Sequence, residues 1–266
     1  MLRSMYSGIS GMKNFQAKLD VLGNNIANVN TYGFKKGRTT FKDLVSQQIS
    51  GASAPTQERG GVNPKQIGLG AQLSTIDTID TQGSLQTTGR PLDLALSGDG
   101  FFVVSDGPNN YFTRAGNFYL DQEGTLVNAD GLKLLDTAGD EIDIPTDAES
   151  FSIGNDGSVT YIQNGVLNAN PQQIGIAKFA NNGGLEKVGS NLYQQTTNSG
   201  AVDINALAGP GTQGAGEIVA GALEMSNVDL SEEFTEMIVA QRGFQANTRI
   251  ITTSDEILQE LVNLKR

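Results

Sequence analysis

Residues 2–29 read LRSMYSGISGMKNFQAKLDVLGNNIANV and carry apolar side chains at helical spacing. One row repeats every seven positions and consists of Met5, Met12, Leu19 and Ile26. Two neighbouring rows widen it, one beginning with Leu2 and Ile9 and the other consisting of Phe15, Leu22 and Val29. This spacing predicts an amphipathic helix over about 2–29 with a coiled-coil-like seam. The signal that ends this helix comes from Asn28, Asn30 and Gly33.

The C-terminal segment repeats this design. Its seven-residue row consists of Leu230, Met237, Phe244, Ile251 and Leu258. The row between these positions is apolar only at its ends, Phe234 and Val262. A further row adds Ile250, Ile257 and Leu264. Asp229, followed by Glu232 three residues later, predicts a capping box at the start of a helix of roughly 35 residues.

Between the two helices the pattern changes to a period of two with frequent turns. Apolar residues alternate at Leu92, Leu94 and Leu96. Dipeptides of the kind that close β-hairpins begin at Asp106, Asp130, Asp156 and Asn164. Residues 150–153 and 158–162 flank one of these turns and predict a hairpin. Short strands at this spacing predict an all-β domain.

The predicted fold class is therefore α+β. Both chain ends form one discontinuous helical domain, and the all-β domain is inserted between them. The predicted segments are an N-terminal helix and turn (1–45), an extended connector (46–74), an all-β outer domain (75–205), a Gly/Pro-containing linker (206–226) and a C-terminal helix (227–266).

The composition excludes most catalytic chemistry. The 266 residues include no cysteine and no histidine, which removes thiolate nucleophiles, Ser-His-Asp triads and the common metal ligands. We therefore expect no catalytic residue, no metal site and no cofactor. The net charge of −11 argues against a nucleic-acid partner. No apolar run approaches the ~20 residues of a membrane span.

Some local patterns have a functional interpretation that their context weakens. Residues 209–214 match G-x-G-x-x-G, but they lie in a Gly/Pro-rich stretch and not between a buried strand and a helix. The acidic stretches 121–125 and 136–143 lack the ligand spacing of a calcium loop. The basic stretch 35–38 is too small for a nucleic-acid surface. Paired carboxylates for glycoside cleavage stay open, because a sequence does not show their separation in space.

The apolar rows exceed what two paired helices need. A two-stranded coiled coil uses two rows on each helix, whereas each predicted helix carries three. The surplus would be exposed in a monomer, and exposed apolar strips mark interfaces. We predict that these rows form an assembly interface, within one chain and between copies. An adhesin-like binding module on a helical stalk is the alternative.

Several longer motifs resemble one known family. They are Asn24–Lys36, Ser226–Phe234 and Met237–Arg242 near the chain ends, and 83–85, 98–102 and 113–118 in the middle. These stretches are similar to the bacterial flagellar rod and hook family. The residues of its motifs that we single out are Asn24, Asn25, Ala27, Asn28, Thr31, Gly33, Phe34, Ser226, Asn227, Val228, Gln241 and Arg242.

The resemblance implies a structural, non-enzymatic subunit of the bacterial flagellum. Such subunits leave the cell unfolded through the flagellar export apparatus, without a cleaved signal peptide, and polymerise helically. The implied partners are further copies of this chain and the neighbouring rod, hook-cap and hook–filament junction proteins, with no nucleic acid and no membrane insertion. Within the family, we expect a subunit of the extracellular hook, the flexible joint that passes motor torque to the filament. A subunit of the rigid distal rod of the basal body is the alternative.

Overall fold

The computed structural model describes residues 2–55 and 59–264, which form two compact units. The terminal unit consists of the chain up to Ala27, the stretch Gly37–Thr78 and the chain from Asp229 onward. The β unit consists of Asn28–Lys36 and Ile79–Val228. The fold is α+β, with long helices from both chain ends and β structure between them, as the sequence predicts.

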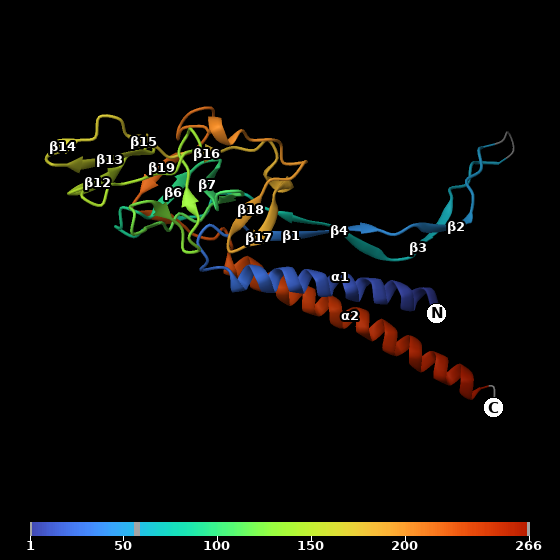
Figure 1. The fold of residues 1–266 in the computed structure, drawn as a ribbon. Coiled ribbons are helices and arrows are strands. Elements are labelled where there is room, and N and C mark those ends of the chain that lie inside the picture. Colours follow the sequence, from blue (N-terminus) through green and yellow to red (C-terminus); the bar gives the residue numbers. More distant parts are fainter. Residues whose placement is uncertain (1, 56–58, 265–266) are drawn as a thin grey trace. The chain divides into compact units, whose positions relative to one another are not determined.

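Two long helices dominate the terminal unit, α1 (Leu2–Ala27) and α2 (Leu230–Asn263), and they lie side by side (Figure 1). Asp229 caps the start of α2, because its carboxylate accepts hydrogen bonds from the backbone N–H groups of Ser231 and Glu232 at 2.8 and 3.4 Å. The acidic side chains of the first turn suit the positive end of the helix dipole. The predicted start of this helix is therefore confirmed.

The first helix ends at Ala27, before the predicted end near Val29. The carbonyl of Asn28 accepts a hydrogen bond from the N–H of Thr31 at 3.1 Å, which closes a turn directly after the helix. Gly33 follows with a φ of 69°, a left-handed conformation that glycine adopts without strain. Val29 therefore lies in the β unit and not on the helical row to which the sequence assigns it.

A two-stranded ribbon of β1 (Gly37–Asp43) and β4 (Ala71–Thr78) packs along α1. A Cβ atom at Gly37 would lie 3.3 Å from Val21, so the ribbon comes close to the helix there. The antiparallel register places Arg38 opposite Asp77, and these exposed side chains form an ion pair at 3.2 Å. The pKa of the Asp77 carboxyl is lowered, first by a hydrogen bond from Thr75 and then by Arg38.

Beyond the ribbon, β2 (Ser46–Ser50) and β3 (Lys65–Gly68) pair as an arm (Figure 1). Every residue of both strands is exposed. The sequence predicts an extended connector over 46–74, whereas the structure has strand pairing there, and β4 begins inside the stretch. Backbone hydrogen bonds make this pairing, and the polar, Gly-rich sequence has no alternating pattern that would reveal it.

The β unit is built from short strands in small antiparallel sheets. An eight-stranded sheet has the order β17-β18-β8-β7-β11-β10-β9, with β16 beside β7. A four-stranded sheet contains β12 to β15, and two strand pairs, β19 with β6 and β20 with β5, complete the unit. The bounds are β5 (Leu85–Thr87), β6 (Leu94–Ser97), β7 (Phe101–Ser105), β8 (Asn110–Thr113), β9 (Tyr119–Leu120), β10 (Leu126–Val127), β11 (Lys133–Leu134), β12 (Ser150–Ile153), β13 (Ser158–Gln163), β14 (Val166–Leu167), β15 (Gln172–Gln173), β16 (Ile176–Ala177), β17 (Glu186–Gly189), β18 (Leu192–Gln194), β19 (Glu217–Ala220) and β20 (Ala222–Glu224), with short 3₁₀ helices at Asn182–Gly184 and Ile204–Ala206.

Two predictions for this region have different outcomes. Strands β12 and β13 pair antiparallel across the expected turn, which confirms the predicted hairpin. The predicted linker 206–226, in contrast, contains β19 and β20, whose Ile218 and Leu223 are buried. The β unit thus extends to Val228 and includes Asn28–Lys36, whereas the sequence places its boundaries at 75 and 205.

Strand β7 lies between the two hydrophobic clusters of the β unit. Phe102 and Val104 point into the larger cluster, while Phe101 and Val103 point into the smaller one. Successive side chains of a strand point to opposite faces, so a strand that is apolar at every position is buried on both. The ring of Phe102 also meets that of Phe118 edge to face, with the ring centroids 5.5 Å apart.

We expect Phe102→Ala to lower the free energy of unfolding of the β unit by about 3–5 kcal/mol, because it leaves a cavity beside Phe118. Urea unfolding followed by near-UV circular dichroism measures the change. Val188→Ala in the exposed strand β17 is the control, with an expected change of less than about 0.5 kcal/mol. Equal losses for the two variants would contradict this account of the core.

Candidate assembly interface

One side of α2 faces α1 and forms a seam in the terminal unit. Along α2, the predicted seven-residue row from Met237 to Leu258 is half-buried. Small or polar residues lie between the positions of this row, namely Ala240, Asn247 and Ser254, and two of them are fully buried. The predicted intermediate row is not in the seam, since Phe234 and Val262 are 50% and 65% exposed. An apolar pattern alone misses this second row because its members are small.

The facing side of α1 has the expected large side chains. Met5, Met12, Leu19 and Ile26 are half-buried. From the flanking row, Leu22 is buried and Phe15 is half-buried, whereas Ile9 is more exposed. The side chain of Leu2 lies outside the described part of the chain. Of these residues, Phe15 contacts Gly243 of α2 and Met12 contacts Thr248, which brings both to the seam.

Helical glycines allow the two helices to approach closely. A Cβ atom at Gly243 would lie 2.5–2.8 Å from ring atoms of Phe15, so the ring occupies the space that any side chain would need. A Cβ atom at Gly11 would lie 2.8 Å from the amide of Asn247. The contacts pair early residues of α1 with late residues of α2, so the helices run antiparallel.

Polar side chains connect the two helices toward the C-terminal end of α1. Lys18 and Glu236 form an ion pair at 2.9 Å. Asn25 is buried, and its Nδ2 donates to Glu233 Oε2 at 3.0 Å and to the carbonyl of Gly37 at 2.9 Å. Its Oδ1 accepts from the N–H of Gly37 at 2.9 Å. This motif residue therefore joins α1 to both α2 and β1.

A broad apolar surface of α2 has no cover within the terminal unit. Gly8 of α1 approaches Ile251 of α2. Beyond this contact, α1 continues only over Leu2–Ser7, whereas α2 continues over the longer stretch Thr252–Asn263. Exposed apolar residues of α2 outside the seam are Phe234, Ile238, Val239, Ile250, Ile257, Leu261, Val262 and Leu264. At the N-terminal end of this helix Leu230 is also exposed. Exposed apolar surface of this extent is typical of an interaction site.

The remaining N-terminal motif residues lie in or beside the segment Asn28–Lys36 of the β unit. Thr31 donates its hydroxyl to Asn28 Oδ1 at 3.1 Å. Gly33 lies against the backbone of Arg114 and Ala115, where a Cβ atom would come within 2.6 Å. The ring of Phe34 lies 5.2 Å from the ammonium nitrogen of Lys187. Asn24 and Ala27, at the end of α1, are exposed.

Asn227 of the C-terminal motif joins three parts of the β unit. Its Oδ1 accepts from the N–H of Lys36 at 2.8 Å, and its Nδ2 donates to the carbonyls of Ile79 and Thr81 at 2.8 and 3.2 Å. The neighbouring Ser226 accepts from the N–H of Val228 through its hydroxyl. The other C-terminal motif residues, Gln241 and Arg242, are exposed on α2.

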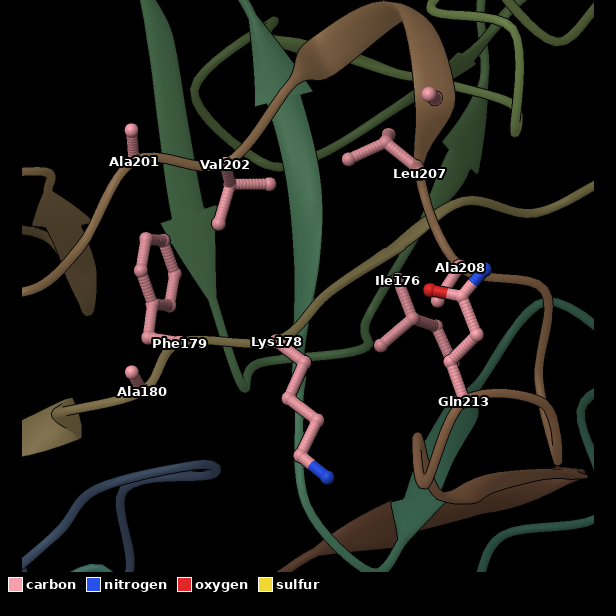
Figure 2. A pocket seen from close by; sticks show the side chains of 10 residues that line it. Ile176, Lys178, Phe179, Ala180, Ala201, Val202, Leu207, Ala208 and Gln213 are labelled. Atoms are coloured by element: carbon pink, nitrogen blue, oxygen red, sulfur yellow. The ribbon is translucent and has the colours of Figure 1, made fainter.

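A hollow of about 360 Å³ opens beside β16 in the β unit (Figure 2). Val202, Leu207 and Ile176 form apolar walls, and the chain of Lys178 extends away from Val202 and Leu207 (Figure 2). Apart from this ammonium group, the lining has no ionisable side chain. The hollow therefore offers no pair of groups that could transfer a proton.

Among residues 2–55 and 59–264, no group of three or more aspartates and glutamates is placed to hold a metal ion. No helix in the same ranges is both long and apolar enough to cross a membrane.

Three known protein families match successive parts of the chain. The description "Flagella basal body rod protein" matches residues 5–35, "Flagellar hook protein FlgE/F/G D1 domain" matches 95–161, and "Flagellar basal body rod FlgEFG protein C-terminal" matches 219–264. The "Flagellar basal-body rod protein FlgG" of Bacillus subtilis (strain 168) is 62% identical over 266 residues, which is 100% of both chains. The chain belongs to the flagellar rod and hook family.

A rod protein and a hook protein from one organism, Borreliella burgdorferi, allow the two branches of the family to be compared with this chain. Its "Flagellar basal-body rod protein FlgG" is 38% identical over 274 residues, and its "Flagellar hook protein FlgE" is 33% identical over 444 residues. Both alignments cover all of each chain. The present chain has 266 residues, so the hook relative carries long insertions that this chain lacks.

Rod and hook family proteins are structural components of the flagellum, where they polymerise and associate with other flagellar components. The sequence comparison therefore confirms the family that the motifs indicate. Within the family, the hook expectation is less well supported than its alternative, because the rod relatives match without long insertions.

The close contact at Gly243 predicts opposite effects of two glycine substitutions. Gly243→Ala places a methyl group against Phe15 and should lower the free energy of unfolding of the helices by about 1–3 kcal/mol. Gly23→Ala is the matched control, because nothing lies within 4 Å of its Cβ position, and alanine there should add about 0.5–1 kcal/mol. Thermal unfolding followed by far-UV circular dichroism measures both. Stabilisation by Gly243→Ala would contradict the described seam.

Proposed function

We propose that this chain is a subunit of the distal rod of the bacterial flagellum. The observation that carries the proposal is the end-to-end match to the rod protein of Bacillus subtilis, at 62% identity and without a net difference in alignment length. The long insertions of the hook relatives favour the same assignment. In this role the chain is a building block of a drive shaft and has no catalytic task.

The apolar surface of α2 supports helical polymerisation. A monomer leaves Ile250, Ile257 and Leu261 in water, and burying them against another copy would gain roughly 25 cal/mol for each Å² of apolar surface. The seam of one chain is already filled by its own α1, so this surface remains for neighbouring copies. Neighbouring rod and hook subunits are the proposed partners at the two ends of the polymer.

The proposed route to the assembly site is the flagellar export apparatus, without a cleaved signal peptide. The chain is proposed to pass through it unfolded and to pair its two helices on arrival. Pairing of the helices after export is consistent with the antiparallel seam, because the seam needs residues from both ends of the chain.

Localisation tests the rod assignment. A short epitope inserted at the exposed turn Asn164–Gly165, between β13 and β14, allows gold labelling of purified hook–basal bodies in the electron microscope. We expect label on the rod below the hook, and cells without the chain should lack hooks. Label along the hook would overturn the rod assignment and leave the family unchanged.

We also expect Ile257→Glu combined with Leu261→Glu to abolish self-association, because two carboxylates on the apolar surface of α2 would be desolvated in the polymer. Sedimentation of the full-length protein at high concentration measures polymer formation. The melting temperature of the monomer should change little, since both side chains are exposed.

Thr252→Glu is the matched control, as it adds a carboxylate to another side of the same exposed helix end. This control should still polymerise. If the double variant polymerises as well as the unchanged protein, the proposed contact surface is wrong.

A further inference from the structure

Two cations share one carboxylate in the interior of the β unit. Lys35 Nζ lies 2.6 Å from Glu224 Oε1, and Arg114 Nη1 lies 3.3 Å from Glu224 Oε2. The side chains of Lys35, Glu224 and Arg114 are only 1%, 0% and 3% exposed. Glu224 Oε1 also accepts from the N–H of Gly83 at 3.0 Å. Neither the assembly surface nor the seam of the helices uses this cluster.

The cluster has an unused hydrogen-bond donor and a second carboxylate nearby. Arg114 Nε is buried and has no hydrogen-bond partner among the described residues. Burial lowers the pKa of the Lys35 ammonium group, and the charge of Glu224 opposes this shift. Asp80 also faces the cluster, and burial raises the pKa of its carboxyl. Burying the Lys35 cation is therefore costly, and Glu224 is its fully buried counter-ion.

Lys35 belongs to a segment that is bound to the rest of the β unit at several points. We name Asn28–Lys36, which connects α1 to β1, the strap. The strap N–H of Gly33 donates to the carbonyl of Glu224 at 2.8 Å, and Lys35 Nζ donates to the carbonyl of Thr81 at 2.9 Å. In the opposite direction, Lys187 Nζ donates to the carbonyl of Lys35 at 3.2 Å.

The docking site for the strap is charge-balanced before the strap arrives. Residues 79–228 supply Asp80 and Lys187, whose opposite charges interact, and Glu224 and Arg114, which form an ion pair. Docking adds the Lys35 cation to this pair. Its ion-pair partner is Glu224, 189 positions further along the chain, so this pair forms only if Glu224 is already in place. Glu224 in turn lies on β20, which pairs with β5.

We infer that the strap is charge-gated: Lys35 allows Asn28–Lys36 to dock on the β unit only after Glu224 has been placed beside Arg114. The strap, which follows α1 in the chain, then docks after β20 has paired with β5. A chain whose C-terminal part is still missing keeps Lys35 in water and the strap open. This inference concerns the folding of the chain itself and holds for a rod or a hook subunit.

The gate predicts unequal effects of removing its two partners. Glu224→Gln leaves Lys35 and Arg114 as two buried cations without their carboxylate, which favours an open strap with Lys35 in water. Lys35→Met removes the gated charge, keeps an apolar stem of similar length, and leaves the Glu224–Arg114 pair intact. Because the charge of Lys35 is what Glu224 offsets, Lys35→Met should also close the strap again in the Glu224→Gln background.

Hydrogen exchange of the full-length protein tests the gate at the amides of Gly33 and Lys36, which are hydrogen-bonded in the docked strap. Glu224→Gln should accelerate their exchange about a hundredfold or more. Lys35→Met alone should change it less than about threefold, and the double variant should exchange at least about tenfold more slowly than Glu224→Gln alone. The amide of Phe102 in β7 reports on the core of the β unit.

Glu141→Gln is the matched control, because it removes the acid of the exposed Lys133–Glu141 ion pair and should leave strap exchange unchanged. The inference is overturned if Lys35→Met opens the strap as strongly as Glu224→Gln, or if the double variant exchanges as fast as Glu224→Gln. If Glu224→Gln also accelerates exchange at Phe102, the β unit has unfolded. In that case the exchange of the Gly33 and Lys36 amides in the Lys35→Met variant decides, because the inference requires the strap to stay closed in this variant.

Discussion

The antiparallel seam between α1 and α2 is the contact on which the rest of the terminal unit depends. Its helices come from opposite ends of the chain, so everything between them must leave the seam and return to it. The ribbon of β1 and β4 packs along α1, and in the sequence the β unit lies between the two helices. Glycines and small residues at positions such as Gly243 and Ala240 allow the helices to approach closely. Outside the seam, several large apolar side chains of α2 remain exposed.

The exposed apolar side chains of α2 relate the fold to the proposed polymer. Large side chains such as Ile257 and Leu261 are not needed to hold the two helices together, and they remain exposed in the single chain. A protein that folded for itself alone would gain by placing polar residues there. The proposed function accordingly depends on surfaces, and the lining of the hollow beside β16 contains a single ionisable side chain, Lys178.

Two of the motif residues, Asn25 and Asn227, join separate segments of the chain, one in each unit. Asn25 binds the backbone of Gly37 and the carboxylate of Glu233 in the terminal unit, while Asn227 binds Lys36, Ile79 and Thr81 in the β unit. A side-chain amide suits both positions because it donates and accepts at once. The buried Lys35 binds the strap to the β unit through a charged group. Unlike a neutral amide, this ammonium group needs the carboxylate of Glu224 as its counter-ion.

The elements with a local signal could be predicted from the amino-acid sequence: the helical rows, the Asp229 cap, the hairpin of β12 and β13, and the division into helical ends and a β-rich middle. Helical and strand periods and turn dipeptides lie within a few residues, so no partner is needed to interpret them. Three features became visible only in the folded chain: Ala240 and Ser254 are buried on α2, β19 and β20 belong to the β unit, and Lys35 pairs with Glu224. Small residues leave no apolar pattern, and a contact between residues 189 positions apart depends on how the intervening strands pair.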